Sequence, residues 1–172
     1  MGEIVSIDAI AELGERLRAE HRRIVFTNGH FDLLHVGHLR YLREAHDLGD
    51  VLVVGVNDDA TVTRRKGPGR PIIPAAERAE LLAGLACVDY VTIFHDLTAG
   101  PTIEALRPDV YVKGGDYTID PDPSNGKQPL LEASLVQAYG GEVRILPLLP
   151  GHSTSWIEHQ IIERSRRNNE DR

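Results

Sequence analysis

The sequence predicts a doubly wound α/β protein, with a five-stranded parallel sheet and helices on both faces. Strand-like apolar segments alternate with helix-like segments through almost the whole chain. The run VLVVGVN at 51–57 is apolar without interruption, as expected of a strand that helices cover on both faces. A chain of 172 residues is long enough to bury one core, so we expect a single domain over residues 1–172.

The elements follow from the same alternation and from helix start and stop signals. Strands are expected at 23–28, 51–57, 89–94, 109–115 and 142–148. Helices are expected within the N-terminal segment 1–22 (at 7–20) and at 36–48, 74–86, 102–108, 130–141 and 153–166. The basic stretch TRRKGPGRPI at 63–72 and the segment 118–129, rich in Pro, Asp, Asn and Gly, are expected to be loops, the second one mobile. The charged tail 167–172 is expected to fray.

Composition narrows the classes of partner. The formal net charge of -7 argues against a nucleic-acid or anionic-membrane surface, because both need a basic face. The single cysteine, Cys87, excludes an internal disulfide and suits a reducing compartment. The first residues lack the pattern of a signal peptide, and no apolar run approaches membrane-spanning length. We therefore expect a cytoplasmic protein with neither nucleic-acid nor membrane partners.

The stretch NGHFDLLHVGH at 28–38 follows the first predicted strand and is unusually rich in histidine and glycine. His35 and His38 are three residues apart at the start of a helix, so they share a face near free backbone amides that attract anions. Gly29 and Gly37 would let a ligand approach the backbone. This arrangement suits a polyphosphate. A zinc site with Asp32 as third ligand, or a purely structural role for the histidines, stays open from the local spacing.

Two further segments favour phosphate. GHSTS at 151–155 places three consecutive hydroxyls, Ser153–Ser155, at the start of the last helix, where they would face the histidine pair; one of them is also an ordinary helix cap. Arg64, Arg65, Lys66 and Arg70 form a basic cluster, which is either a solvated loop or a phosphate contact. No G-x-G-x-x-G follows the first strand and no G-x-x-x-x-G-K-[ST] occurs, which disfavours ordinary dinucleotide folds and Walker-type ATPases.

FTNGHFDLLHVGH, together with HSTS before the last helix, resembles the nucleotidyltransferase superfamily, with its H-x-G-H motif. Within it, RRKGPGRPI, ERAELLAGLACVDYV, ALRPDVYVKGGDY and AYGGEVRILPLLPGHST make the chain most similar to the D-glycero-β-D-manno-heptose 1-phosphate adenylyltransferases. The resemblance covers most of 24–154 and implies a Rossmann-like nucleotidyltransferase fold. It implies transfer of AMP from ATP to a sugar 1-phosphate, giving ADP-heptose and pyrophosphate. His30, where a small residue or cysteine is expected, and the longer loop at 120–128 depart from the pattern.

The resemblance also implies roles for individual residues. Charge stabilisation during the reaction is expected from His35, His38 and Lys66. Nucleotide binding is expected from Thr27, Asn28, Gly29, His30, Phe31, Gly37, His38, Lys113, Gly114, Gly115, Asp116, Gly151, Ser153, Thr154 and Ser155. Acceptor binding is expected from Asp32, Asn57, Asp59, Arg65, Lys66 and Arg78, although Arg78 could instead form a helix-surface salt bridge. No side chain is expected to bind metal, because Mg²⁺ would be held by the phosphates and water.

Three alternatives remain. The same motifs would serve a cytidylyltransferase acting on glycerol 3-phosphate or a phosphoalcohol. A non-catalytic nucleotide-sensing module and a zinc-dependent hydrolase belong to other classes. The resemblance further implies a homodimer, and the lack of a sugar-kinase domain implies that a separate kinase and a phosphatase act in the same pathway.

Overall fold

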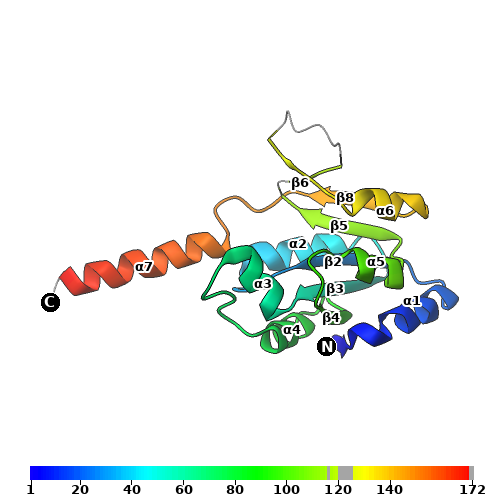
Figure 1. The fold of residues 1–172 in the computed structure, drawn as a ribbon, viewed down its shortest axis with the longest axis horizontal. Coiled ribbons are helices and arrows are strands. Elements are labelled where there is room, and N and C mark those ends of the chain that lie inside the picture. The colour runs from blue at the N-terminus through cyan, green and yellow to red at the C-terminus, as the bar shows by residue number, and fades with distance from the viewer. Residues whose placement is uncertain (116, 120–125, 171–172) are drawn as a thin grey trace.

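The structure, a computed structural model, describes residues 1–115, 117–119 and 126–170, with side chains to residue 167. Six strands form one sheet in the order β1-β4-β3-β2-β5-β8, and every neighbouring pair is parallel (Figure 1). These strands are β1 (Glu3–Val5), β2 (Ile24–Gly29), β3 (Val51–Asn57), β4 (Tyr90–Phe94), β5 (Val110–Gly114) and β8 (Glu142–Leu146). The doubly wound α/β prediction is confirmed.

Strand β1, at the edge of the sheet, was not predicted from the sequence. It has only three residues, of which two are exposed, so it leaves no apolar run to detect. It pairs with β4 through Glu3 opposite Tyr90, and the prediction of a helical segment over 1–22 is therefore wrong at its start. Only a 3-10 turn (Ile7–Ala9) and helix α1 (Ile10–Ala19) follow the strand.

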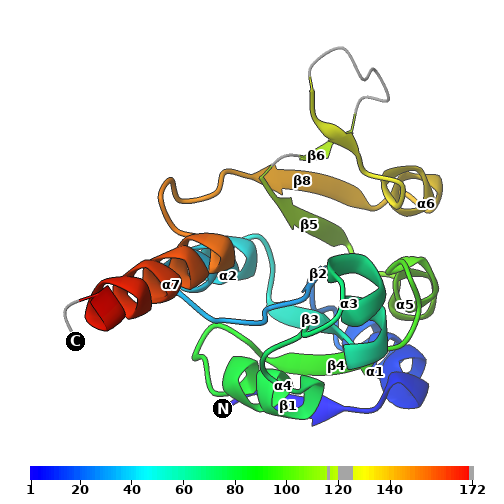
Figure 2. The same ribbon diagram turned by 60° about the vertical axis from the view of Figure 1, so that its left-hand side comes forward.

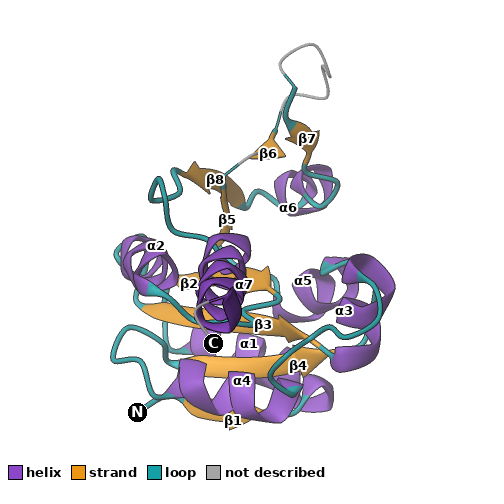
Figure 3. Cartoon of the chain, turned by 90° about the vertical axis from the view of Figure 1, so that its left-hand side faces the viewer, coloured by secondary structure: helices purple, strands orange, loops and turns teal. Residues whose placement is uncertain are grey.

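Alternate residues of the central strands pack into two separate hydrophobic cores. Ile24 and Phe26 of β2 pack into the core covered by α1, α5 (Gly100–Leu106) and α6 (Ala133–Ala138). Val25 faces the other core, beneath α2 (Val36–His46) and α4 (Ala75–Ala83). This two-sided burial explains the uninterrupted apolar runs, and Figures 2 and 3 show helices on both faces.

The basic stretch 63–72 is partly helical, which corrects the loop prediction. Helix α3 (Asp59–Lys66) carries Arg64, Arg65 and Lys66 in its last turn, and Asp58 caps its start by accepting from the Thr61 amide at 2.8 Å. Gly67, with φ of 93°, ends the helix, so only the following residues form a Gly/Pro loop. The missed signal was the helix-capping aspartate directly after β3.

The remaining differences lie near the C-terminus. Part of the predicted loop 118–129 forms a two-stranded sheet of β6 (Tyr117–Thr118) and β7 (Gln128–Pro129), while 120–125 lie outside the described residues. Helix α7 (Thr154–Glu170) passes Arg166 and so extends into the expected tail. It begins beside α2 and projects away from the sheet (Figures 1 and 2). No described helix combines the length and apolarity needed to cross a membrane.

Candidate active site

The site forms where β2 and β5 lie side by side and the chain leaves them in opposite directions along the sheet. In open parallel sheets, the crevice beyond the carboxyl ends of such strands is the usual ligand site. Lys113 at the end of β5 donates from Nζ to Asn28 O at 3.0 Å and to Asn28 Oδ1 at 3.2 Å, and so ties the two strand ends together. Burial lowers the pKa of Lys113 to about 8.

A cavity of about 240 Å³ opens at this point, and we call it the nucleotide-side cavity. It is lined by predicted residues from the ends of β2 and β5 and from the starts of α2 and α7: Asn28, Gly29, His30, Phe31, His35, Gly37, His38, Lys113, Gly114, Ser153 and Thr154. It is also lined by residues that were not predicted, namely Tyr41, Tyr117, Leu148, Leu149 and His152. Segments distant in sequence therefore meet around one cavity.

The two histidines of the H-x-G-H motif stack on each other, with ring centroids 3.9 Å apart. Burial, and secondarily the neighbouring His35 ring, lower the pKa of His38 to about 4. Burial and His152 also lower the pKa of His35. The Nδ1 atoms of both rings are buried and have no hydrogen-bond partner among the described residues. At neutral pH the pair therefore presents uncharged imidazoles with unused hydrogen-bonding capacity.

The start of α2 is open as well. His35 is its N-cap residue, but its side chain makes no capping hydrogen bond, and the first amide bonded back to it is that of Leu39. A Cβ on Gly37 would approach the His35 ring to 2.9 Å and His152 Cβ to 3.3 Å. Gly37 thus makes room for the His35 ring, and it also lines the nucleotide-side cavity as predicted.

Phe31 fixes the other side of the motif. Its φ of 48° lies in the left-handed region, which is strained for a bulky residue and persists only where the surrounding structure enforces it. Its ring is buried, meets His38 edge-on at 5.3 Å between centroids, and lies 3.1 Å from where a Cβ on Gly29 would be. Gly29 is therefore needed for this packing.

At the start of α7, Ser153 Oγ accepts a hydrogen bond from the Trp156 amide at 3.1 Å, so this hydroxyl caps the helix. Ser153 lines the nucleotide-side cavity, Ser155 lines its neighbour, and Thr154 between them lines both. The three hydroxyls are thus divided between the two cavities, and the hydroxyl of Ser153 is already engaged as the helix cap.

The second cavity, of about 500 Å³, is called the acceptor-side cavity below. It shares its lining with the first at His30, Phe31, His38, Tyr117, Leu148 and Thr154. Its own lining includes the predicted residues Asp32, Lys66 and Ser155, and two that were not assigned to the site, Arg70 and Glu158. Burial, followed by the charges of Lys66 and Arg65, lowers the pKa of His30 to about 4 between the two cavities.

Arg78 does not face the acceptor, contrary to the expectation, nor does it form a surface salt bridge. Its side chain has no exposed surface. The guanidinium donates to Ile73 O at 2.8 Å, to His30 O, to Asn57 O at 3.0 Å and to Asp59 Oδ1 at 2.7 Å. Arg78 therefore joins the loops after β2 and β3. Asn57 and Asp59 contribute to the same contact as acceptors for its guanidinium.

Other predicted residues are also structural in this geometry. Thr27 Oγ1 lies 2.6 Å from the Tyr41 hydroxyl, which donates to Val112 O at 3.1 Å, so Thr27 is buried under the cavity. Arg65 does not line either cavity and donates to Leu97 O, although its charge contributes to lowering the pKa of His30. Gly115 and Gly151 have φ of 82° and 74° and shape the turns beside the site, while Asp116 lies outside the described residues.

Some cavity residues had a signal in the sequence. Arg70 belongs to the recognised basic cluster, and Tyr117 and Leu148 lie in the segments that carried the resemblance. Tyr41 also lies within the range that the resemblance covers, but it was given no role. Glu158 lies outside that range and reads as an ordinary helical residue. Among the described residues, no group of three or more His, Cys, Asp or Glu side chains could hold a metal ion.

The chain is similar to several known proteins. A protein named "Bifunctional protein HldE" from Syntrophotalea carbinolica is 50% identical over 155 residues, which cover 88% of this chain and 30% of that protein. Its namesake from Trichlorobacter lovleyi is 46% identical over 162 residues, covering 94% of this chain and 31% of that protein. The chain thus spans about a third of the length of these curated relatives.

Two solved structures resemble the fold. A lipopolysaccharide core biosynthesis protein from Thermoplasma volcanium matches with a TM-score of 0.58 and 30% identity, covering 74% of this chain and 97% of that one. A pantoate-beta-alanine ligase from Francisella tularensis matches with a TM-score of 0.59 and 14% identity, covering 92% and 76%, which supports the fold alone. The family profile described as Cytidylyltransferase-like matches residues 26–164. The chain belongs to the cytidylyltransferase-like family.

Proposed function

We propose that this chain transfers AMP from ATP to a sugar 1-phosphate, namely D-glycero-β-D-manno-heptose 1-phosphate, and releases ADP-heptose and pyrophosphate. The observation that carries the proposal is the pair of adjoining cavities that share His30, His38 and Thr154. One cavity offers neutral donors suited to a nucleotide, and the other offers Lys66 and Arg70 to a phosphorylated acceptor.

The chemistry requires positioning more than proton transfer. An oxygen of the acceptor phosphate attacks the α-phosphorus of ATP, and the bond from that phosphorus to the bridging oxygen breaks as its electron pair leaves with pyrophosphate. A phosphate monoester has a second pKa of about 6, so the attacking oxygen is largely ionised at neutral pH. No general base is needed. The protein contributes alignment and stabilisation of the charge on the phosphates.

Particular residues fit these tasks. His35 and His38, held neutral by burial, each have one ring N–H to donate to a phosphate oxygen, and the open start of α2 adds backbone donors. Lys66, on the rim of the acceptor-side cavity, supplies a full positive charge. Mg²⁺, bound by the triphosphate and water, would neutralise charge on the leaving pyrophosphate. The carboxylates of the acceptor-side cavity, Asp32 and Glu158, are engaged by Arg70.

The test is pyrophosphate release with Mg²⁺, using ATP or CTP against heptose 1-phosphates of both anomers, hexose 1-phosphates and glycerol 3-phosphate. Release with ATP and the β-anomer of the heptose 1-phosphate alone is the expected result. Release with CTP and glycerol 3-phosphate would replace the substrates and keep the mechanism. Nucleotide binding without release for any acceptor would favour a sensing module.

We also propose a cytoplasmic homodimer, which rests on the resemblance, together with a separate sugar kinase and a phosphatase that act in the same pathway. Light scattering of the purified protein should give twice the mass of the chain. A monomer at micromolar concentration would overturn the dimer and leave the reaction untouched.

A further inference from the structure

A chain of three charged side chains crosses the acceptor-side cavity. Arg70 donates from Nη1 to Asp32 Oδ2 at 3.1 Å, and its Nη2 is paired with Glu158 Oε2. Asp32 follows β2, Arg70 lies in the loop after α3, and Glu158 lies in the second turn of α7. Three segments distant in sequence therefore meet on one guanidinium.

The two carboxylates on Arg70 differ in how they are satisfied. Asp32 Oδ1 accepts from the amides of Ile72 at 2.8 Å and Ile73 at 3.0 Å. Burial alone would raise the pKa of Asp32, but the hydrogen bonds from Ile73, Arg70 and Ile72 lower it overall. Glu158, in contrast, uses only Oε2, while its Oε1 is buried with no partner among the described residues. Asp32 is a fixed part of the loop, and Glu158 is held by a single contact.

The net charge of the cavity also favours displacement of Glu158. The lining contains two positively charged side chains, Lys66 and Arg70, and two negatively charged ones, Asp32 and Glu158, so the charges cancel. A phosphate monoester, with a charge near −2, would meet no net attraction. Once Glu158 leaves, Nη2 of Arg70 is free and the balance becomes positive, which favours a charge-assisted hydrogen bond to phosphate.

We propose that Glu158 is a resident counter-anion: it pairs with Arg70 in the free protein, and the phosphate of the acceptor displaces it from Nη2. The inference rests on the proposed function only in taking the acceptor to be a phosphate monoester. Arg70 then binds the acceptor phosphate while Asp32 keeps the guanidinium in place. The side chain of Glu158 leaves by rotation on α7, four residues beyond Thr154 on the same face.

The test compares Glu158→Gln with the wild type. Glutamine keeps the size of the side chain and one neutral hydrogen bond, but removes the competing charge. The KM for the sugar 1-phosphate should fall about fivefold, which corresponds to roughly 1 kcal/mol, with the KM for ATP as internal reference. Glu163→Gln is the matched control, because Glu163 is on the same helix and pairs only with the exposed His159 and Arg167 among the described residues. It should leave both values unchanged.

Arg70→Ala supplies the second arm. It should raise the acceptor KM at least about tenfold, the equivalent of about 1.4 kcal/mol, and Glu158→Gln should have no further effect in that background. An acceptor KM that is unchanged or raised in Glu158→Gln overturns the proposal, since Glu158 would then be a bystander or would support Arg70.

Failure of the proposed function is distinguishable. If the wild type releases no pyrophosphate with any sugar 1-phosphate, calorimetry with inorganic phosphate still separates the variants. Tighter phosphate binding by Glu158→Gln than by the wild type would support the counter-anion, and equal or weaker binding would overturn it.

Discussion

The polar groups of the two cavities differ in charge and in whether they already have partners. The polar groups of the nucleotide-side cavity are mainly neutral, with His35 and His38 stacked, desolvated and without partners on Nδ1. Those of the acceptor-side cavity are mainly charged and already paired, with Arg70 between Asp32 and Glu158. A cavity with unpaired neutral donors costs stability when empty, whereas a cavity with paired charges costs binding free energy when filled.

The largest expected effect lies on the nucleotide side. His38→Ala and His35→Ala should each lower kcat about 10²–10³-fold, because each removes a preorganised donor to a phosphate. Turnover is measured by pyrophosphate release and folding by circular dichroism, which should not change. His159→Ala, an exposed histidine on α7, is the control. Near-normal turnover in both variants would mean that the nucleotide does not bind in this cavity.

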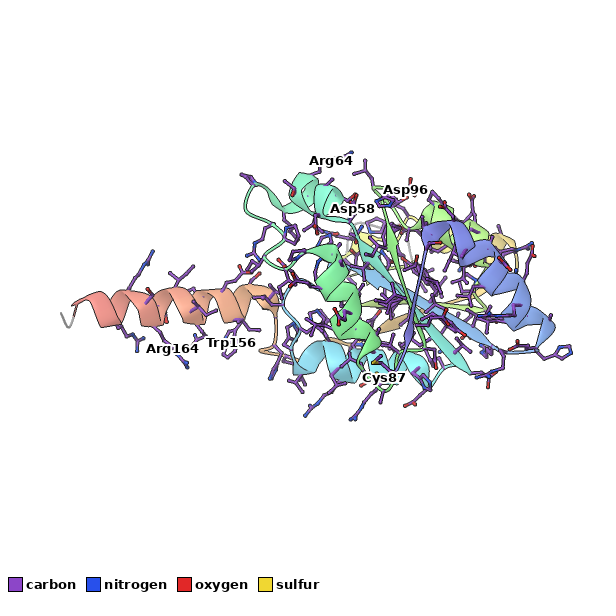
Figure 4. All side chains as sticks on the ribbon, turned by 90° about the horizontal axis from the view of Figure 1, so that it is seen from below. Asp58, Arg64, Cys87, Asp96, Trp156 and Arg164 are labelled. Carbon is purple, nitrogen blue, oxygen red and sulfur yellow. The ribbon has the colours of Figure 1, made fainter. Side chains whose placement is uncertain are left out.

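Arg78→Ala should come next, because Arg78 joins the loop after β3 to the loop after β2, and the loop after β2 lines both cavities. The variant leaves the carbonyls of His30, Asn57 and Ile73 without their donor and should lower the free energy of unfolding by about 3 kcal/mol. Urea unfolding measures this value. Arg64→Ala, in which an exposed arginine of α3 is removed (Figure 4), should stay within about 0.5 kcal/mol of the wild type.

Gly37→Ala tests the packing of the histidine pair alone. The added Cβ would lie 2.9 Å from the His35 ring, which must turn away. We expect kcat to fall about tenfold, since overpacking costs about 1–3 kcal/mol, while ATP still binds. Gly100→Ala, where the nearest atom would be 3.5 Å away, is the control for activity: alanine before Pro101 costs some stability, but kcat should not change. Equal activity of the two variants would mean that the His35 ring position is unimportant.

A further prediction concerns pH. The pKa values of His30 and His38 are lowered from 6.5 to about 4, so the unfolded chain binds more protons than the folded protein between these values. The free energy of unfolding should therefore decrease as pH falls from about 6.5 to 4, and this contribution should be level above 6.5. The free energy of unfolding is measured with urea at several pH values in this range. For His38→Ala it should change less with pH than for the wild type. An identical dependence on pH would mean that His38 is not held neutral by folding.

The nucleotide side could be predicted from sequence because half of its lining residues are close neighbours in the chain. Asn28 to His38 follow one strand and open one helix, so the local pattern almost fixes their placement. The acceptor side depends on contacts between distant segments, and no local pattern showed that Glu158 would meet Arg70. Arg78 was misjudged for the same reason: its charge suggested a ligand, but its partners are carbonyls brought to it by folding.

The open start of α2 has a practical consequence. The structure describes no acceptor for the amides of Val36, Gly37 and His38, whereas Asp58 caps α3 and Ser153 caps α7. These three amides are therefore natural reporters of occupancy. In the free protein they should exchange rapidly with deuterium, and a bound anion should slow them selectively, so that exchange at three consecutive positions would register ligand binding without any label on the ligand.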